Sequence, residues 1–100
     1  MRRGTTPTHT FTIPIDVSLI KRLKIIYVQN NETILTKELD DCDVENNMLN
    51  VTLTQEETFE FDHGKPVELQ MRILTLGGDA IASHIRKVGV ERLLDKEVLK

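Results

Sequence analysis

The sequence predicts an all-β protein, a small antiparallel β-sandwich with one or two short helical turns. Apolar residues recur at every second position in several runs, for example at Phe11, Ile13 and Ile15, which is the period of a half-buried strand. Residues that allow tight turns, such as Asn30-Asn31, separate these runs. A chain of 100 residues forms one domain and can bury a core without a metal or a disulfide.

The first half of the chain supplies five of the expected strands. The first strand begins at Thr8, because threonines alternate there with apolar residues. The second alternates from Leu23 to Tyr27 and the fifth from Leu49 to Leu53, while the third and fourth lie between two asparagine pairs. The expected ranges are 8–15, 21–29, 33–39, 41–45 and 48–54.

The second half of the chain begins with a helical turn. Thr54 and Glu57 form a capping box, in which each side chain can bond the backbone N–H of the other. Pro66 then starts a strand over 66–76, and Gly77-Gly78 provides a hairpin turn before a last strand over 80–90. About seven short strands at this spacing are typical of an immunoglobulin-like sandwich. An open barrel is the alternative architecture.

The two ends of the chain carry different expectations. In the ending "VERLLDKEVL", apolar residues at helical spacing predict a turn or two of helix that docks on the sandwich. At the start, "MRRGTTP" contains a glycine and a proline that oppose helix. We therefore expect residues 1–7 to form an extended, mobile arm and residues 8–100 to form the single domain.

Charge is distributed unevenly along the chain, whose net charge is -3. Residues 1–24 hold five basic side chains against one acid, residues 32–62 hold ten acids against one base, and residues 63–100 hold seven bases against five acids. The acidic middle block argues against a surface that binds nucleic acid as a whole. A patchy surface suited to contact between subunits is the better interpretation.

The candidate binding residues come from the two charged blocks. The basic candidates are expected to form one patch if the first strand lies beside the second, and the acidic candidates are expected to face water while Cys42 and Val44 turn inward. The interaction residues that we predict are Arg2, Arg3, Lys21, Arg22, Lys24, Asp41, Asp43 and Glu45.

No motif for catalysis, a cofactor or a metal is found in the sequence. The alternating acids at Asp41, Asp43 and Glu45 approach a calcium loop, but Asn46 stands where that loop requires glycine. The three histidines lack metal-ligand spacing, and the single Cys42 allows no intrachain disulfide. We therefore expect no enzymatic activity, no cofactor, no metal and no small-molecule substrate.

Membrane and nucleic-acid roles are also disfavoured by the sequence. Its longest apolar runs are far shorter than the roughly 20 residues that cross a bilayer, and we expect no secretory signal, because threonines follow the basic start. Proteins that bind single strands need aromatic stacking platforms, for which Tyr27 is the one side chain left free by the expected core. We therefore do not expect a membrane or nucleic acid as the main partner.

Several stretches of the chain resemble small uncharacterised proteins of phages and prophages of Gram-positive bacteria. They are, in order, "MRRGTTPTHTF", "VTLTQEETFEF", "VELQMRILTLGGDAIASHI" and "VERLLDKEVL". Such proteins are encoded among genes for virion structure, so the resemblance implies a tail, baseplate or neck component, or an accessory of one. It also implies that the partners are copies of this chain or other phage structural proteins, first in the host cytoplasm during assembly and then in the virion.

Two other functions stay open on the sequence. One is a module that binds a ligand on the host surface, since sandwiches also serve that purpose; a glycan site would need an exposed aromatic side chain, for which Tyr27 is the candidate. The other is a small regulator that binds nucleic acid through the basic N-terminal arm.

Overall fold

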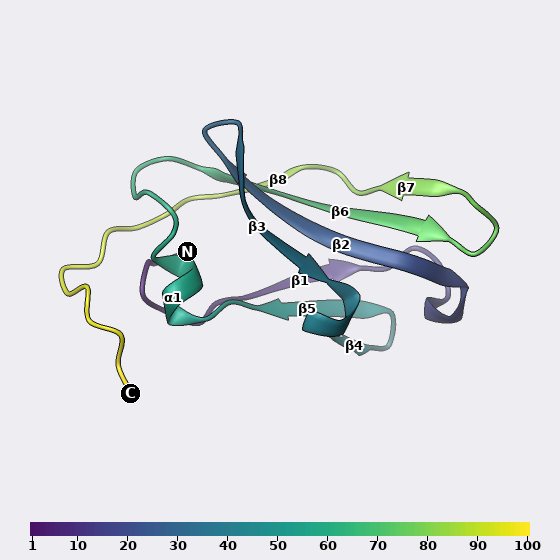
Figure 1. Ribbon diagram of the computed structural model, residues 1–100, viewed down its shortest axis with the longest axis horizontal. Coiled ribbons are helices and arrows are strands. Elements are labelled where there is room, and N and C mark those ends of the chain that lie inside the picture. Colours follow the sequence, from purple (N-terminus) through teal and green to yellow (C-terminus); the bar gives the residue numbers. More distant parts are fainter.

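The computed structural model describes residues 1–100 and contains eight strands in two antiparallel sheets (Figure 1). The prediction of an immunoglobulin-like antiparallel β-sandwich is confirmed, and the alternative of an open barrel is wrong, because the sheets are separate. The strands are β1 (Thr8–Thr12), β2 (Ile20–Gln29), β3 (Glu32–Glu38), β4 (Asp43–Glu45), β5 (Met48–Thr52), β6 (Val67–Thr75), β7 (Ala80–Ala82) and β8 (Arg86–Val88).

The smaller sheet has the strand order β1-β5-β4. Its register pairs Phe11 with Leu49, and both side chains are buried. The alternate positions of the same strands face outward, where the hydroxyl oxygens of Thr8 and Thr52 lie 2.8 Å apart. The period-two pattern of the sequence thus produces a sheet with one apolar and one polar face.

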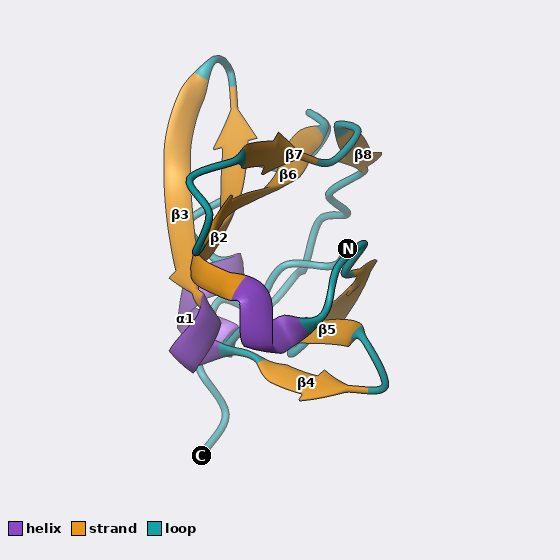
Figure 2. Cartoon of the chain, turned by 90° about the vertical axis from the view of Figure 1, so that its right-hand side faces the viewer, coloured by secondary structure: helices purple, strands orange, loops and turns teal.

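The larger sheet has the order β3-β2-β6-β7, and β8 also pairs with β6. Its two central strands bring apolar side chains together across the ladder, as in the pair Ile25 and Met71. The β2–β3 hairpin turns at Asn30 and Asn31, which both have positive φ values, 55° and 61°. Figure 2 shows this sheet as one layer and β4 and β5 as part of the other.

The last predicted strand, 80–90, is two strands in the structure. β7 and β8 both pair with β6, but Ser83, His84 and Ile85 separate them. Ser83 donates its backbone N–H to the carbonyl of Met71, and its hydroxyl oxygen accepts from the N–H of Met71. A side-chain oxygen therefore replaces a backbone acceptor at this point, and the ladder is interrupted there.

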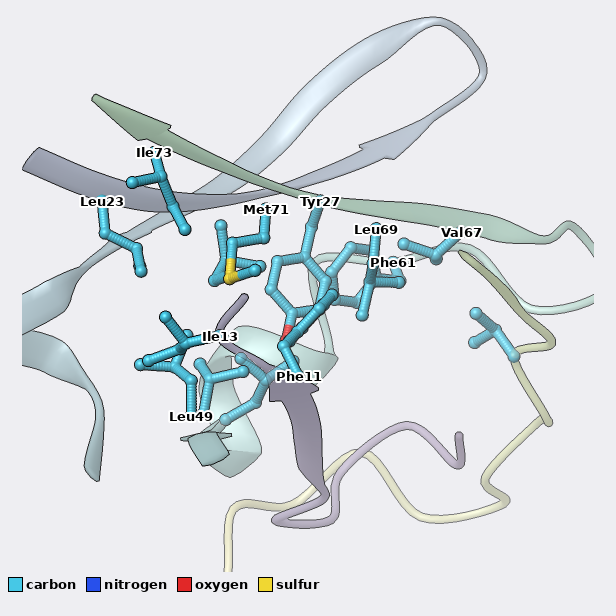
Figure 3. Close-up of a cluster of buried hydrophobic side chains, with 14 residues drawn as sticks. Phe11, Ile13, Leu23, Tyr27, Leu49, Phe61, Val67, Leu69, Met71 and Ile73 are labelled. Carbon is cyan, nitrogen blue, oxygen red and sulfur yellow. The ribbon is translucent and has the colours of Figure 1, made fainter. Parts of the chain in front are cut away.

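The core lies between the two sheets and forms one cluster of 14 buried hydrophobic residues (Figure 3). Figure 3 shows Tyr27 reaching from the larger sheet into the middle of this cluster. Its hydroxyl lies 2.8 Å from Nδ1 of His9, a buried residue of the smaller sheet. Phe61, which follows the helical turn, is also fully buried.

Three short helical turns connect the strands: η1 (Val17–Leu19), η2 (Leu39–Asp41) and α1 (Gln55–Thr58). The predicted capping box at α1 is confirmed, because the side chain of Thr54 accepts from the N–H of Glu57 and that of Glu57 accepts from the N–H of Thr54. None of the helices is long or apolar enough to cross a membrane.

The predicted C-terminal helix is wrong, because residues after Val88 form no helix. The backbone of Glu91 is instead hydrogen-bonded to Met1 and Arg3 in a short parallel bridge. Further along, the amide oxygen and nitrogen of the Gln55 side chain both bond the backbone of Leu99. These contacts use backbone groups that a helix would need. Leu94, which belongs to the expected apolar face of the helix, is 86% exposed.

Residues 1–7 lie against the sandwich rather than projecting from it. The N–H of Gly4 donates to the hydroxyl of buried Thr58 (2.8 Å), and the N–H of Leu53 donates to the carbonyl of Pro7 (3.0 Å). Gly4 has φ +74°, and a Cβ atom there would meet the side chains of two residues, Leu93 and Phe59. In the structure these residues are therefore bonded to their own chain, and glycine allows them to approach α1 closely. The mobility expected for residues 1–7 stays a prediction.

Candidate functional site

The outer face of the larger sheet carries a group of cations at the end where β2 begins. The register places Lys24 of β2 directly opposite Arg72 of β6 and, on its other side, opposite Glu38 of β3. Arg22 lies two residues before Lys24, on the same face. These side chains face outward because the alternate positions of the same strands are buried in the core.

A hollow of about 190 Å³ lies among these cations. Ala80 on the edge strand β7 has a short side chain, which leaves room beside the longer basic ones. We call this site the cationic hollow, and its lining residues are Arg22, Lys24, Arg72, Ile73, Leu74 and Ala80.

The charges of the cationic hollow are only partly neutralised. Arg22 pairs with Glu38 at 2.9 Å, and this hydrogen bond lowers the pKa of the Glu38 carboxyl below its usual value. Lys24 and Arg72 form no ion pair in the protein. Like charges directly opposite each other destabilise a sheet. The hollow therefore presents positive charge that an external carboxylate or other anion could neutralise.

The outer face of the smaller sheet has the opposite charge. Asp43 and Glu45 of β4 lie beside Asn50 and Met48 of β5 in the register, on the face that points away from the core. Both carboxylates are exposed and neither forms an ion pair. We call these two residues the acidic edge. The rest of this face carries hydroxyl and amide groups, including a bond from Thr10 to Asn50 (2.7 Å).

The predicted basic residues fall into two separate groups. Lys21, Arg22 and Lys24 lie together at the start of β2. Arg2 and Arg3 bond to the C-terminal segment and to the residue after α1. Figure 1 shows α1 and the N-terminus at the opposite end of the long axis from the start of β2. The expected single patch is therefore wrong, because β1 pairs with β5 rather than with β2.

Arg2 and Arg3 bond to their own chain. A guanidinium nitrogen of Arg2 donates to the carbonyl of Arg92 at 2.7 Å, and one of Arg3 donates to the carbonyl of Phe59 at 3.0 Å. The Arg3 guanidinium also lies 5.6 Å from the centre of the Phe59 ring. These contacts hold the first residues of the chain against α1 and the C-terminal segment.

The three predicted acidic residues are also divided. Asp43 and Glu45 form the acidic edge, but Asp41 belongs to η2, where its carboxylate accepts from the N–H of Glu38 at 2.8 Å. Asp41 therefore caps a turn. No group of three His, Cys, Asp or Glu side chains is arranged to hold a metal ion. Cys42 is partly buried, its thiol donates to the Glu38 carbonyl, and burial raises its pKa.

Arg72 is not among the interaction residues predicted from the sequence, although the alternation of Val67, Leu69 and Met71 places it on the outer side of its strand. What the sequence lacked was the pairing register that sets it opposite Lys24.

Tyr27 was the sequence candidate for an exposed stacking platform, and this is wrong, because its side chain is fully buried. Tyr27 instead packs near the ring of Phe61, with 6.0 Å between the ring centres. Its burial removes the aromatic side chain on which a glycan or single-strand site depended.

Comparisons with known proteins give one structural likeness. No protein-family model matches the chain, and no curated protein matches it. Among solved structures, the chain is similar to the V domain of amphioxus IgVJ-C2, with 13% identity over 90% of this chain and 96% of that one. The TM-score is 0.37, and a likeness of this degree has no bearing on function.

Proposed function

We propose that the protein is a non-catalytic docking module that binds other proteins through its two charged outer sheet faces. The observation that carries this proposal is the pair Lys24 and Arg72, which lie opposite each other at the cationic hollow and form no ion pair. Glu38 lies on the other side of Lys24, but its carboxylate is bonded to Arg22. Such an arrangement disfavours the free protein and favours a complex in which a partner supplies negative charge.

The setting that we propose is a phage particle, as a structural or accessory component of the tail, baseplate or neck. Its support is the resemblance of four stretches of the sequence to prophage proteins encoded among virion genes. A small sandwich whose opposite faces carry opposite charge is suited to such a role, because it can contact one neighbour through each face.

Mass spectrometry of purified phage particles tests this function. We expect the wild-type protein in a fixed ratio to the major tail protein. The double variant Lys24→Glu, Arg72→Glu should be lost from the particles, because it reverses the charge of the cationic hollow.

The matched control is Lys65→Glu, Lys96→Glu, which makes the same change of net charge at two exposed lysines that form no ion pair. This control should enter particles normally. Absence of the wild-type protein from particles would refute the virion role, and normal incorporation of the Lys24 and Arg72 variant would refute docking through this face.

A further inference from the structure

We infer that the partner at the cationic hollow is a second copy of this chain, bound head to tail through its acidic edge. In this arrangement, Asp43 and Glu45 of one copy lie against Arg22, Lys24 and Arg72 of the next. The inference rests on the proposed docking function and names the partner of that same site.

Charge complementarity between the two outer faces is the first argument. The outer face of the larger sheet carries four cations against two carboxylates: Arg22, Lys24, Arg72 and Lys87 against Glu38 and Glu68. The outer face of the smaller sheet carries only Asp43 and Glu45 as charged residues. One face therefore has an excess of two positive charges and the other an excess of two negative charges, and the two would attract each other.

The spacing of the charges is the second argument. Asp43 and Glu45 are two residues apart on one strand, and so are Arg22 and Lys24, which corresponds to about 7 Å in each case. Arg72 lies on the adjacent strand, with its Cβ about 5 Å from that of Lys24. Two carboxylates of a neighbour can therefore meet two or three cations at the same time.

Contact between the acidic edge of one copy and the cationic hollow of the next would also cover apolar side chains that lie beside these charged groups. Met48 lies beside Glu45 in the register and is 38% exposed. Leu74 and Ala80 line the cationic hollow. A contact that brings the two charged groups together would remove part of this apolar surface from water, which adds a favourable contribution to the ionic one.

The two faces belong to different sheets and point away from each other, as Figure 2 shows for the two layers. A contact between unlike faces leaves one free face at each end of the complex, so that further copies can add. We therefore expect a ring or a stack rather than a closed dimer with two identical contacts.

Sedimentation velocity with charge-reversed variants tests this arrangement. At an ionic strength of about 50 mM, the wild-type protein should form species larger than a dimer as its concentration rises, and about 500 mM salt should reverse this. The variants Lys24→Glu, Arg72→Glu and Asp43→Lys, Glu45→Lys should each self-associate more weakly than the wild type, by about tenfold or more. Both variants should remain folded, because the changed side chains lie outside the core. Circular dichroism checks this.

Mixing the two charge-reversed variants distinguishes head-to-tail contact from other kinds of association. The variant Lys24→Glu, Arg72→Glu has negative charge at both sites, and the variant Asp43→Lys, Glu45→Lys has positive charge at both. Each variant repels other copies of itself, but unlike copies attract each other at both sites. An equimolar mixture should therefore form large species in which the two variants alternate.

Neutral variants provide the matched control for the mixture. Lys24→Gln, Arg72→Gln keeps only a working acidic edge, and Asp43→Asn, Glu45→Gln keeps only a working cationic hollow. Their mixture should stop at a heterodimer, because one contact forms and neither free end can add another copy. Association of either neutral variant with itself to the wild-type extent would overturn the head-to-tail arrangement.

Failure of this inference can be told apart from failure of the proposed function. A wild-type protein that stays monomeric at low salt, yet enters particles in a manner that depends on Lys24 and Arg72, would overturn the second copy as partner and leave docking intact. Neutral variants that form the same large species as the wild type would also overturn it. Mixtures that behave as described, with monomeric single variants, would support it.

Discussion

The buried His9 should make the stability of the protein depend on pH. Its Nδ1 lies 2.8 Å from the Tyr27 hydroxyl, and the residue is 8% exposed. Burial, assisted by the positive charge of Arg86, lowers the pKa of His9 from 6.5 to about 4. In the unfolded chain the imidazole regains its ordinary pKa, so the unfolded state binds more protons between these two values.

The sign and the size of the effect follow from this difference. The contribution of His9 to stability is greatest above pH 6.5, falls as the pH decreases, and is fully lost below pH 4. The whole difference corresponds to about 3 kcal/mol, of which about 2 kcal/mol is lost between pH 7 and pH 5. The lowered pKa values of Glu38, Glu57 and Glu91 affect stability mainly around and below pH 4.5, the ordinary pKa at which these carboxyl groups become protonated in the unfolded chain.

Urea denaturation at pH 7 and pH 5 measures this loss. The comparison is with His9→Asn, which places an amide near the position of Nδ1 and cannot be protonated in this range. Its free energy of unfolding should change little between the two pH values. His63 and His84 are present in both proteins. The difference in pH dependence between the wild type and the variant therefore reports His9. Equal pH dependence in wild type and variant would refute the assigned role of His9.

Four further changes are expected to alter stability, each measured by denaturation against the wild type. Gly4→Ala should cost about 2 kcal/mol, because its Cβ would meet two neighbouring side chains at positive φ. Ser83→Ala should cost about 1 kcal/mol, because it leaves a strand N–H without its acceptor. Deletion of residues 1–7 should lower the melting temperature, contrary to the mobile arm expected from sequence, since their bonds to the domain are lost. Arg72→Thr should raise the free energy of unfolding by about 0.5 kcal/mol. An unchanged stability in any of these variants would contradict the corresponding contact.

The sequence predicted the central strands because their burial follows a simple period. Val67, Leu69 and Met71 alternate with polar residues, and the structure buries all three. The capping box of α1 was also predictable, because both of its partners lie within four residues of the chain. Both features depend on residues that are close together in the sequence.

Features that depend on distant partners could not be predicted in this way. The C-terminal pattern is amphipathic, but pairing with residues 1–3 and with Gln55 determines its conformation. The same holds for the candidate site. Alternation placed Arg22 and Lys24 on one face, whereas the approach of Arg72 depends on the register between β2 and β6.

The pair Lys24 and Arg72 links stability to the proposed docking. Repulsion between them weakens the isolated sheet, so Arg72→Thr should stabilise the folded protein and, by removing a cation from the hollow, weaken its self-association. Arg22→Thr is the matched control: it also removes a cation, but it breaks the ion pair with Glu38, so no gain in stability is expected. Urea denaturation and sedimentation of the two variants separate the effects. If Arg72→Thr failed to stabilise the protein, the repulsion would be absent; if it stabilised the protein without weakening association, the cationic hollow would not be the docking site.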